Sequence, residues 1–291
     1  QIYRPLEVVW HHHLSQIEEA LDESIRALRN LLRLDEVHRH GHEESQLKET
    51  LGPFGSSSLN VSALSKVLSK SGSGRGLPEE RLDRINHLLE ALEELRRTCS
   101  ENPETFPSAG LEEDETAIHE KAEAHLKQMA TIFRNLRISQ LEIRAKYDPD
   151  LHDAVFEKFT WRDMSPSELS LCPPFVITGE IGNESGPVLR KILSLMESRK
   201  PFKVFALRTG LKKAYSPTAD PSVPATLAVE MIPLAMRGIY FLQTCEVVDG
   251  YDQRLFAALT SPRPGLISLL AQKTDESGEA FTERSRRALR A

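Results

Sequence analysis

The feature that most constrains the fold is the alternation of short apolar runs with amphipathic segments between residues 173 and 272. The apolar runs lie at about residues 175–178, 203–207, 239–242 and 265–270, and helical periodicity occurs at 187–196, 229–236 and 251–259. A strand that returns parallel to its predecessor needs a crossover, usually a helix. This order therefore predicts a mostly parallel α/β sheet with its sites at the carboxyl ends of the strands.

The first half of the chain has a different pattern. Leucine and isoleucine recur every three or four positions from about residue 2 to 37, which predicts one long amphipathic helix. The same spacing predicts a second helix from Pro78 to about Cys99 and a third over 114–146, because proline and acidic residues suit a first turn. Residues 1–147 are therefore expected to form a helical hairpin or bundle.

The connecting segments set the expected domain boundaries. Glycine, serine and proline are frequent over about 52–76, where ordering would cost roughly 1–2 kcal/mol per residue with little apolar surface to bury. We expect turns, flexible linkers and weak hydrogen-exchange protection there, with a short helix at 59–68. The domains are then the helical region 1–147, a connector at 148–172, the α/β domain at 173–272 and a helical extension at 273–291, giving a mixed α+β/α/β fold class.

Composition excludes several classes of function. The 291 residues carry a net charge of −6, and no apolar run is long enough for a bilayer span, so neither nucleic-acid binding nor a membrane span is expected. Cys99, Cys172 and Cys245 lie far apart without a C-x-x-C pair, which argues against disulfides, a zinc ribbon or an iron–sulfur cluster and favours buried structural thiols in a reducing cytoplasm. The start at Gln1 indicates a processed, truncated or excised chain.

Three further groups of residues suggest sites but have simpler explanations. His11, His12 and His13 point in directions about 100° apart on a helix, and the histidines of 38–42 lie at a probable helix end, so neither cluster predicts a metal site. Trp10 and Trp161 are expected in the core or an interface. The basic segment 284–290 is expected to be part of an amphipathic helix rather than a nucleic-acid site.

The order and spacing of residues 173–272 resemble the thiamine-diphosphate domain of the pyruvate/2-oxoacid:ferredoxin oxidoreductase family. The matching segments are Gly179-Glu-Ile, Lys203-Val-Phe-Ala-Leu-Arg-Thr209, Tyr215-Ser-Pro-Thr218, Met236-Arg-Gly-Ile-Tyr240 and Ser261-Pro-Arg-Pro264. In that family a Gly-Asp-Gly turn follows the first strand, and the second strand ends in Asp-Thr before a Tyr-Ser-Asn-Thr-Gly-Gly-Gln loop. These segments hold magnesium and the diphosphate.

The resemblance implies which residues would form a cofactor site. Glu180 and Thr209 match the magnesium ligands, and the residues that would contact the cofactor are Gly179, Glu180, Thr209, Tyr215, Ser216 and Thr218. No catalytic residue is assigned.

Departures from the family pattern predict a degenerate site. Glu180 is one methylene longer than the family aspartate, in a magnesium shell that tolerates little misplacement. Ile181 replaces a glycine, and the loop 217–221 replaces Asn-Thr-Gly-Gly-Gln with Pro-Thr-Ala-Asp-Pro, which removes donors and adds the repelling charge of Asp220.

Three functional hypotheses follow. The first is a degenerate domain that acts as a scaffold or assembly part of a larger, oligomeric redox protein, whose other domains or subunits are its partners. The second is an active thiamine-diphosphate-dependent 2-oxoacid oxidoreductase segment, which would need thiamine diphosphate and magnesium. The third is a helical protein-interaction module with a small α/β domain, and it would follow if residues 173–272 lacked a parallel sheet.

Overall fold

The computed structural model describes residues 3–40, 43–70, 76–101, 107–181, 186–208, 232, 236–272 and 277–290. Its contacts divide the chain into two units. The α/β unit comprises residues 1–17, 102–131 and 159–291, and the helical unit comprises residues 18–101 and 132–158. Helices α1 (Tyr3–His40) and α5 (Glu115–Ile143) contribute residues to both units.

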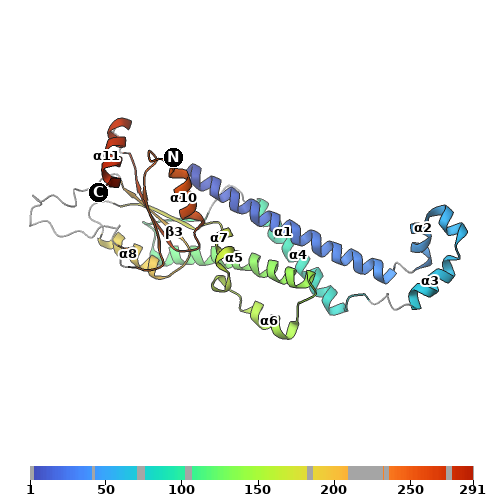
Figure 1. The fold of residues 1–291 in the computed structure, drawn as a ribbon. Helices are drawn as coiled ribbons and strands as arrows, with labels where there is room; N and C mark the ends of the chain where they lie inside the picture. Colours follow the sequence, from blue (N-terminus) through green and yellow to red (C-terminus); the bar gives the residue numbers. More distant parts are fainter. Residues whose placement is uncertain are drawn as a thin grey trace, which may run out of the picture. The chain divides into compact units, whose positions relative to one another are not determined.

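A parallel five-stranded sheet forms the centre of the α/β unit (Figure 1). Its strand order is β1-β2-β3-β5-β4, and every neighbouring pair is parallel. The strands are β1 (Ser108–Gly110), β2 (Val176–Glu180), β3 (Lys203–Arg208), β4 (Tyr240–Thr244) and β5 (Gly265–Leu270). The α/β class and the four strands predicted between 173 and 272 are therefore confirmed.

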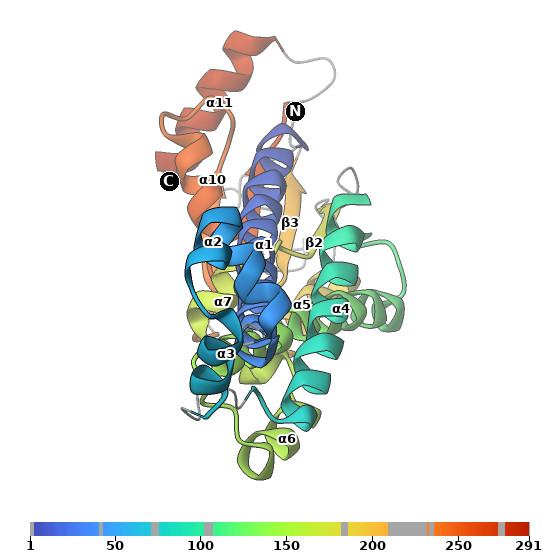
Figure 2. The same cartoon turned by 90° about the vertical axis from the view of Figure 1, so that its right-hand side faces the viewer.

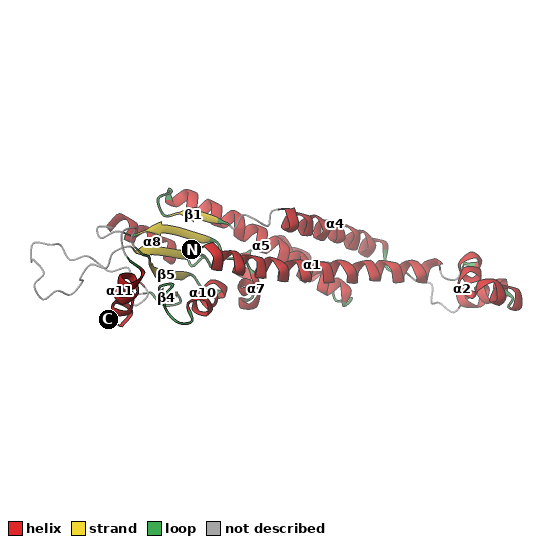
Figure 3. Cartoon of the chain, turned by 90° about the horizontal axis from the view of Figure 1, so that it is seen from above, coloured by secondary structure: helices red, strands yellow, loops and turns green. Residues whose placement is uncertain are grey.

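Apolar residues alternate between the two faces of this sheet, as the two-residue period of a strand requires. Ile177, Val204 and Leu266 lie in one buried cluster with residues of α5 and of α8 (Gly186–Glu197). Val176, Phe205 and Ile267 lie in a second cluster with the start of α1 and with α10 (Tyr251–Thr260). The sheet is thus covered by helices on both faces (Figure 3).

Shorter helices complete the α/β unit. They are η1 (Trp161–Asp163), α7 (Pro166–Leu171) and α11 (Gly278–Arg290). Trp161 is buried, as is Phe281 of α11, which contributes to a small cluster with Cys245 and Leu270. The predicted helices at 187–196 and 251–259 are confirmed, and the basic segment 284–290 lies in a helix, as expected. Most of the helix predicted at 229–236 lies outside the described residues.

In the helical unit, α1 and α4 (Glu79–Glu101) run antiparallel to each other (Figure 2). Arg29 pairs with Glu93 at 2.7 Å, and about one turn further along α4 Arg96 pairs with Asp22, which precedes Arg29 in α1. Each helix buries an apolar face: Leu21, Ile25 and Leu28 of α1, and Ile85, Leu88 and Leu92 of α4. The long helices predicted at 2–37, 78–99 and 114–146 are thus confirmed to within a few residues.

Two local structures differ from the sequence expectations. The turn expected at 52–58 is instead part of α2 (Glu44–Ser58), which bends at Gly52, where φ is 68°. A glycine tolerates this left-handed conformation, so the helix can resume after it.

Other connecting segments agree with the expectations. Helix α3 (Val61–Lys70) falls close to the short helix expected at 59–68, and α6 (Pro149–Glu157) lies in the expected connector. Weak exchange protection over 53–76 stays a prediction.

The second difference is β1, which lies within the region 1–147 that was expected to be helical. It has only three residues, Ser108–Gly110, too few to show a period in the sequence. Ser108, Ala109 and Gly110 pair with Val176, Ile177 and Thr178 of β2. The sheet therefore recruits a strand from the first half of the chain.

Candidate functional site

Gly179 and Glu180 end β2 at the carboxyl edge of the sheet, where ligands bind in open parallel sheets. In the register of β2 and β3, Gly179 lies opposite Ala206 and Glu180 lies opposite Leu207. The backbone N–H of Ile181 donates to the Leu207 carbonyl at 2.8 Å, which continues the ladder past the strand end. The carboxylate-bearing Glu180 is exposed there. The resemblance likewise places Gly179 and Glu180 just after the first strand of the domain.

An apolar side chain covers Gly179. Leu111, which directly follows β1, is only 4% exposed, and its N–H donates to the Thr178 carbonyl at 2.8 Å. A Cβ atom at position 179 would lie 2.5 Å from the Leu111 Cβ. Ile181 packs against the same apolar cluster that contains Leu111. The close approach of Leu111 therefore gives Gly179 a packing role that requires no ligand.

Arg208 ends β3 beside this edge. Burial lowers the pKa of its guanidinium. Magnesium requires oxygen ligands, and a guanidinium has only N–H donors. The Arg208 side chain therefore offers no oxygen ligand to a metal at the carboxyl end of β3.

The described residues include only two of the six residues predicted to contact the cofactor, Gly179 and Glu180. Thr209, Tyr215, Ser216 and Thr218 lie outside the described ranges, so the structure does not test their predicted roles. Within those ranges, no group of three or more His, Cys, Asp or Glu side chains gathers in a way that could hold a metal ion. Of the two predicted metal ligands, Glu180 and Thr209, only Glu180 is described.

A buried lysine, Lys203, lies at the opposite, amino-terminal ends of the strands and bonds the loop before β5. The Lys203 ammonium nitrogen donates to the carbonyls of Ser261, at 2.7 Å, and Arg263. Burial lowers the pKa of Lys203 to about 7. In the register Lys203 lies opposite Gly265, where a Cβ would lie 2.7 Å from the lysine Cδ. The sequence pattern did not indicate this residue, because a lysine at a strand start is usually solvent-exposed.

Two histidines anchor the segment that leads into β2. His13 Nδ1 donates to the Leu171 carbonyl at 2.9 Å, and His125 Nε2 donates to the Pro173 carbonyl at 2.8 Å. Burial lowers the pKa of His125 to about 4 and also lowers the pKa of His13. The two imidazoles thus bond the carbonyls on either side of Cys172.

The cysteines are buried, as expected for structural thiols. Burial, together with the charge of Glu168, raises the pKa of Cys172 to about 12. A thiol with so high a pKa contains almost no thiolate at neutral pH, and thiolate is the nucleophilic form. Cys172 is therefore unsuited to nucleophilic catalysis.

No family model, curated protein or solved structure matches this chain. None of the helices within the described ranges has both the length and the apolar character that crossing a membrane requires.

Proposed function

We propose that the α/β unit is a non-catalytic relative of the thiamine-diphosphate domain of 2-oxoacid:ferredoxin oxidoreductases, and that it acts as a scaffold in the assembly of a larger redox protein. The observation that carries this proposal is the apolar packing at the carboxyl end of β2. Leu111 lies against Gly179, and Ile181 packs into the core cluster. These are the positions at which the family would accommodate the magnesium diphosphate.

Two of the described backbone donors at this edge are also occupied. A diphosphate needs N–H groups and hard oxygen ligands to compensate its charge. The N–H of Leu111 already bonds Thr178, and the N–H of Ile181 already bonds Leu207, both at 2.8 Å. To donate to a diphosphate, these groups would have to give up bonds that extend the sheet. This cost favours the degenerate-site hypothesis over the active one.

The parallel arrangement of the strands supports a scaffold of this fold class. The three-layer packing buries apolar side chains on both faces of the sheet, so the sheet can persist without a cofactor. A degenerate domain of this kind would retain its core while its cofactor loops diverge. We therefore expect its role to depend on its surfaces and on partner subunits that carry the iron–sulfur clusters.

Cofactor retention tests the catalytic half of this proposal. The chain is expressed and purified with thiamine diphosphate and magnesium present, and retained thiamine is measured by mass spectrometry after denaturation. We expect no retention and no 2-oxoacid-dependent reduction of a viologen dye, with a working 2-oxoacid oxidoreductase as the positive control. Stoichiometric thiamine or dye reduction would instead support the active-enzyme hypothesis.

Native mass spectrometry of the protein isolated from its own cells tests the assembly half. We expect the chain in a complex with at least one iron–sulfur redox subunit, identified by its mass and its iron content. A species with the mass of a single copy of the chain, or of its homo-oligomer, would contradict the assembly role.

A further inference from the structure

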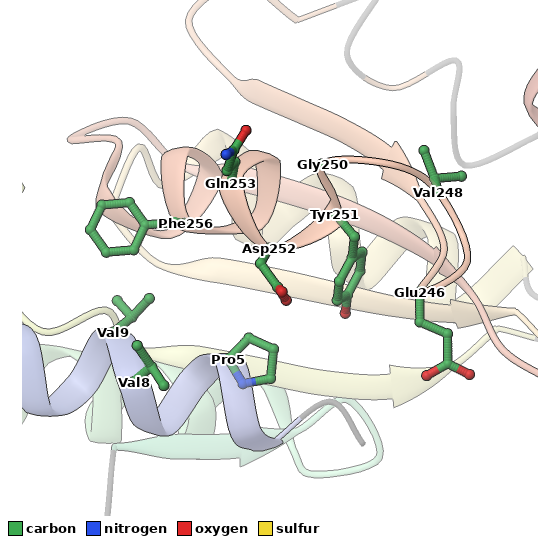
Figure 4. Close-up of a pocket in the computed structure, with 10 residues that line it drawn as sticks. All are labelled: Pro5, Val8, Val9, Glu246, Val248, Gly250, Tyr251, Asp252, Gln253 and Phe256. Atoms are coloured by element: carbon green, nitrogen blue, oxygen red, sulfur yellow. The ribbon is translucent and has the colours of Figure 1, made fainter.

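Exposed large apolar side chains occur in both units. In the α/β unit, Val8 and Phe256 are 59% and 38% exposed and help to line a pocket of about 800 Å³ formed by α1, α10 and the loop after β4 (Figure 4). In the helical unit, Leu151 and Val155 of α6 are 65% and 59% exposed. A helix of only nine residues therefore presents two large apolar side chains to solvent.

The chain that precedes α6 sets its direction. Helix α5 ends in a turn where Ala145 has a φ of 53° and the Lys146 N–H donates to the Leu141 carbonyl at 2.8 Å, a pattern that commonly ends a helix. The Asp148 side chain then caps α6 by accepting from the Asp150 N–H. The first turn of α6 is thus fixed by local hydrogen bonds.

A stack of rings fixes the inner side of α6. Phe156, the buried residue of this helix, stacks on Tyr147 with ring centroids 6.3 Å apart and planes inclined by 12°. The guanidinium of Arg84 in α4 lies 4.7 Å from the Tyr147 ring centroid, and the Tyr147 hydroxyl donates to Asp153 at 2.6 Å. A free helix of this length would be marginal in water. These contacts therefore order α6 through its inner side.

The outer side of α6 combines apolar and acidic residues. Leu151, Ala154 and Val155 are neighbours on the helix surface because they are three and four positions apart, and we call these three residues the α6 face. Asp150 lies four positions before Ala154, and Glu157 lies three positions after it. All five side chains are exposed. Within the part of the chain that the structure describes, neither carboxylate forms an ion pair.

The charge around the α6 face determines which class of partner fits it. Residues 148–158 contain four carboxylates and one lysine, Lys158, which directly follows the helix. This negative charge would repel the phosphates of nucleic acids and of anionic lipids. It would also oppose the pairing of two α6 faces from two copies of the chain. Basic residues beside an apolar patch would instead be attracted.

We propose that the α6 face docks an amphipathic helix of a partner protein, in which an apolar row is flanked by lysine or arginine. The apolar row would pack against Leu151 and Val155, and the basic side chains would lie near Asp150 and Glu157. Apolar anchors spaced three and four positions apart are a recurring mode of helix recognition. The inference stands on the helical unit and adds a surface to the assembly role proposed above.

Photo-cross-linking of the full chain in its own cells tests this proposal. The photoreactive residue p-benzoylphenylalanine replaces Ala154 in one variant and Leu34 of α1, which is 58% exposed, in a matched control. The cross-linked peptides are then sequenced by mass spectrometry. We expect the probe at position 154 to capture one partner segment that the control does not capture. Its sequence should have apolar residues three or four positions apart, flanked by lysine or arginine.

Further substitutions, with the probe kept in place, separate the apolar and charged contributions. Leu151→Gln combined with Val155→Gln should lower the cross-link yield about tenfold, because the apolar contact is lost. Asp150→Asn and Glu157→Gln should each lower it about threefold, as expected for exposed charges. Leu34→Gln removes a similarly exposed apolar side chain and should leave the yield unchanged. Circular dichroism establishes that each variant is folded.

Several results would overturn the proposal. They are a cross-link to a second copy of the chain, to nucleic acid or lipid, or to a segment without basic residues, and a yield no higher than at the control position. A redox complex found by native mass spectrometry without this cross-link would contradict the present inference and leave the assembly role standing. A cross-link to a basic helix of a protein outside any redox complex would do the reverse.

Discussion

At the scale of single residues, His125 makes the stability of the α/β unit sensitive to acid. Burial lowers its folded-state pKa to about 4 from an ordinary value of 6.5. Between about pH 4 and pH 6.5, the unfolded chain therefore binds a proton at this imidazole that the folded protein does not. Stability is fully present above about pH 6.5 and is lost as the pH falls toward 4, by about 2 kcal/mol between pH 7 and pH 5.

The variant His125→Gln tests this titration. Glutamine keeps an N–H donor for the Pro173 carbonyl but cannot be protonated, so urea unfolding should show a smaller loss of stability between pH 7 and pH 5. His87→Gln, on the exposed side of α4, is the control. An unchanged acid sensitivity in the His125 variant would show that this imidazole is not buried in the neutral form.

The packing role of Gly179 leads to a second residue-scale prediction. Gly179→Ala places a Cβ 2.5 Å from the Leu111 Cβ and should lower the free energy of unfolding by about 1–3 kcal/mol. In a Leu111→Gly background, the same change should cost much less, because the crowding atom is gone. Equal costs in the two backgrounds, measured as a double-mutant cycle, would remove the packing explanation for this glycine.

At the scale of elements, a buried carboxylate joins α4 to α5 in the helical unit. Glu142, whose side chain is 1% exposed, accepts from Arg81 at 2.8 Å and from Arg84 at 2.5 Å. Removing one partner of a buried ion pair leaves the remaining charge uncompensated. We expect Glu142→Gln to lower the free energy of unfolding by about 3 kcal/mol.

An exposed ion pair supplies the control for this prediction. Glu94 pairs with Arg97 on α4, and both side chains are at least 60% exposed. Glu94→Gln should change the free energy of unfolding by less than about 1 kcal/mol, because solvent screens the pair. Similar costs for both variants in urea unfolding would show that the Glu142 network does not stabilise the α4–α5 contact.

Elements with many periodic residues were predictable from sequence, whereas short ones and side-chain contacts were not. The helix predicted at 187–196 is found at Gly186–Glu197, because its apolar residues repeat over three turns. The three-residue β1 has no comparable signal. The packing of Leu111 against Gly179 joins residues far apart in sequence, and only the β1–β2 pairing brings them together.

At the scale of the whole molecule, the proposed scaffold role predicts that repairing one ligand will not restore a cofactor site. Glu180→Asp introduces the aspartate that the resemblance would place at this position but leaves Leu111, Ile181 and Arg208 unchanged. We expect this variant to retain no more thiamine after purification than the unmodified chain. Retention restored by this single change would indicate that a side-chain length, and not the packing of the edge, limits binding.

The scaffold proposal requires that the carboxyl ends of β2 and β3 do not bind thiamine diphosphate. Calorimetric titration of the unmodified chain with thiamine diphosphate and magnesium tests it most directly. The packing of Leu111 and Ile181 predicts no saturable heat at micromolar concentrations of the cofactor. A micromolar dissociation constant, equivalent to about −8 kcal/mol, would contradict the claim and make Glu180 and Thr209 the first candidates for metal ligands.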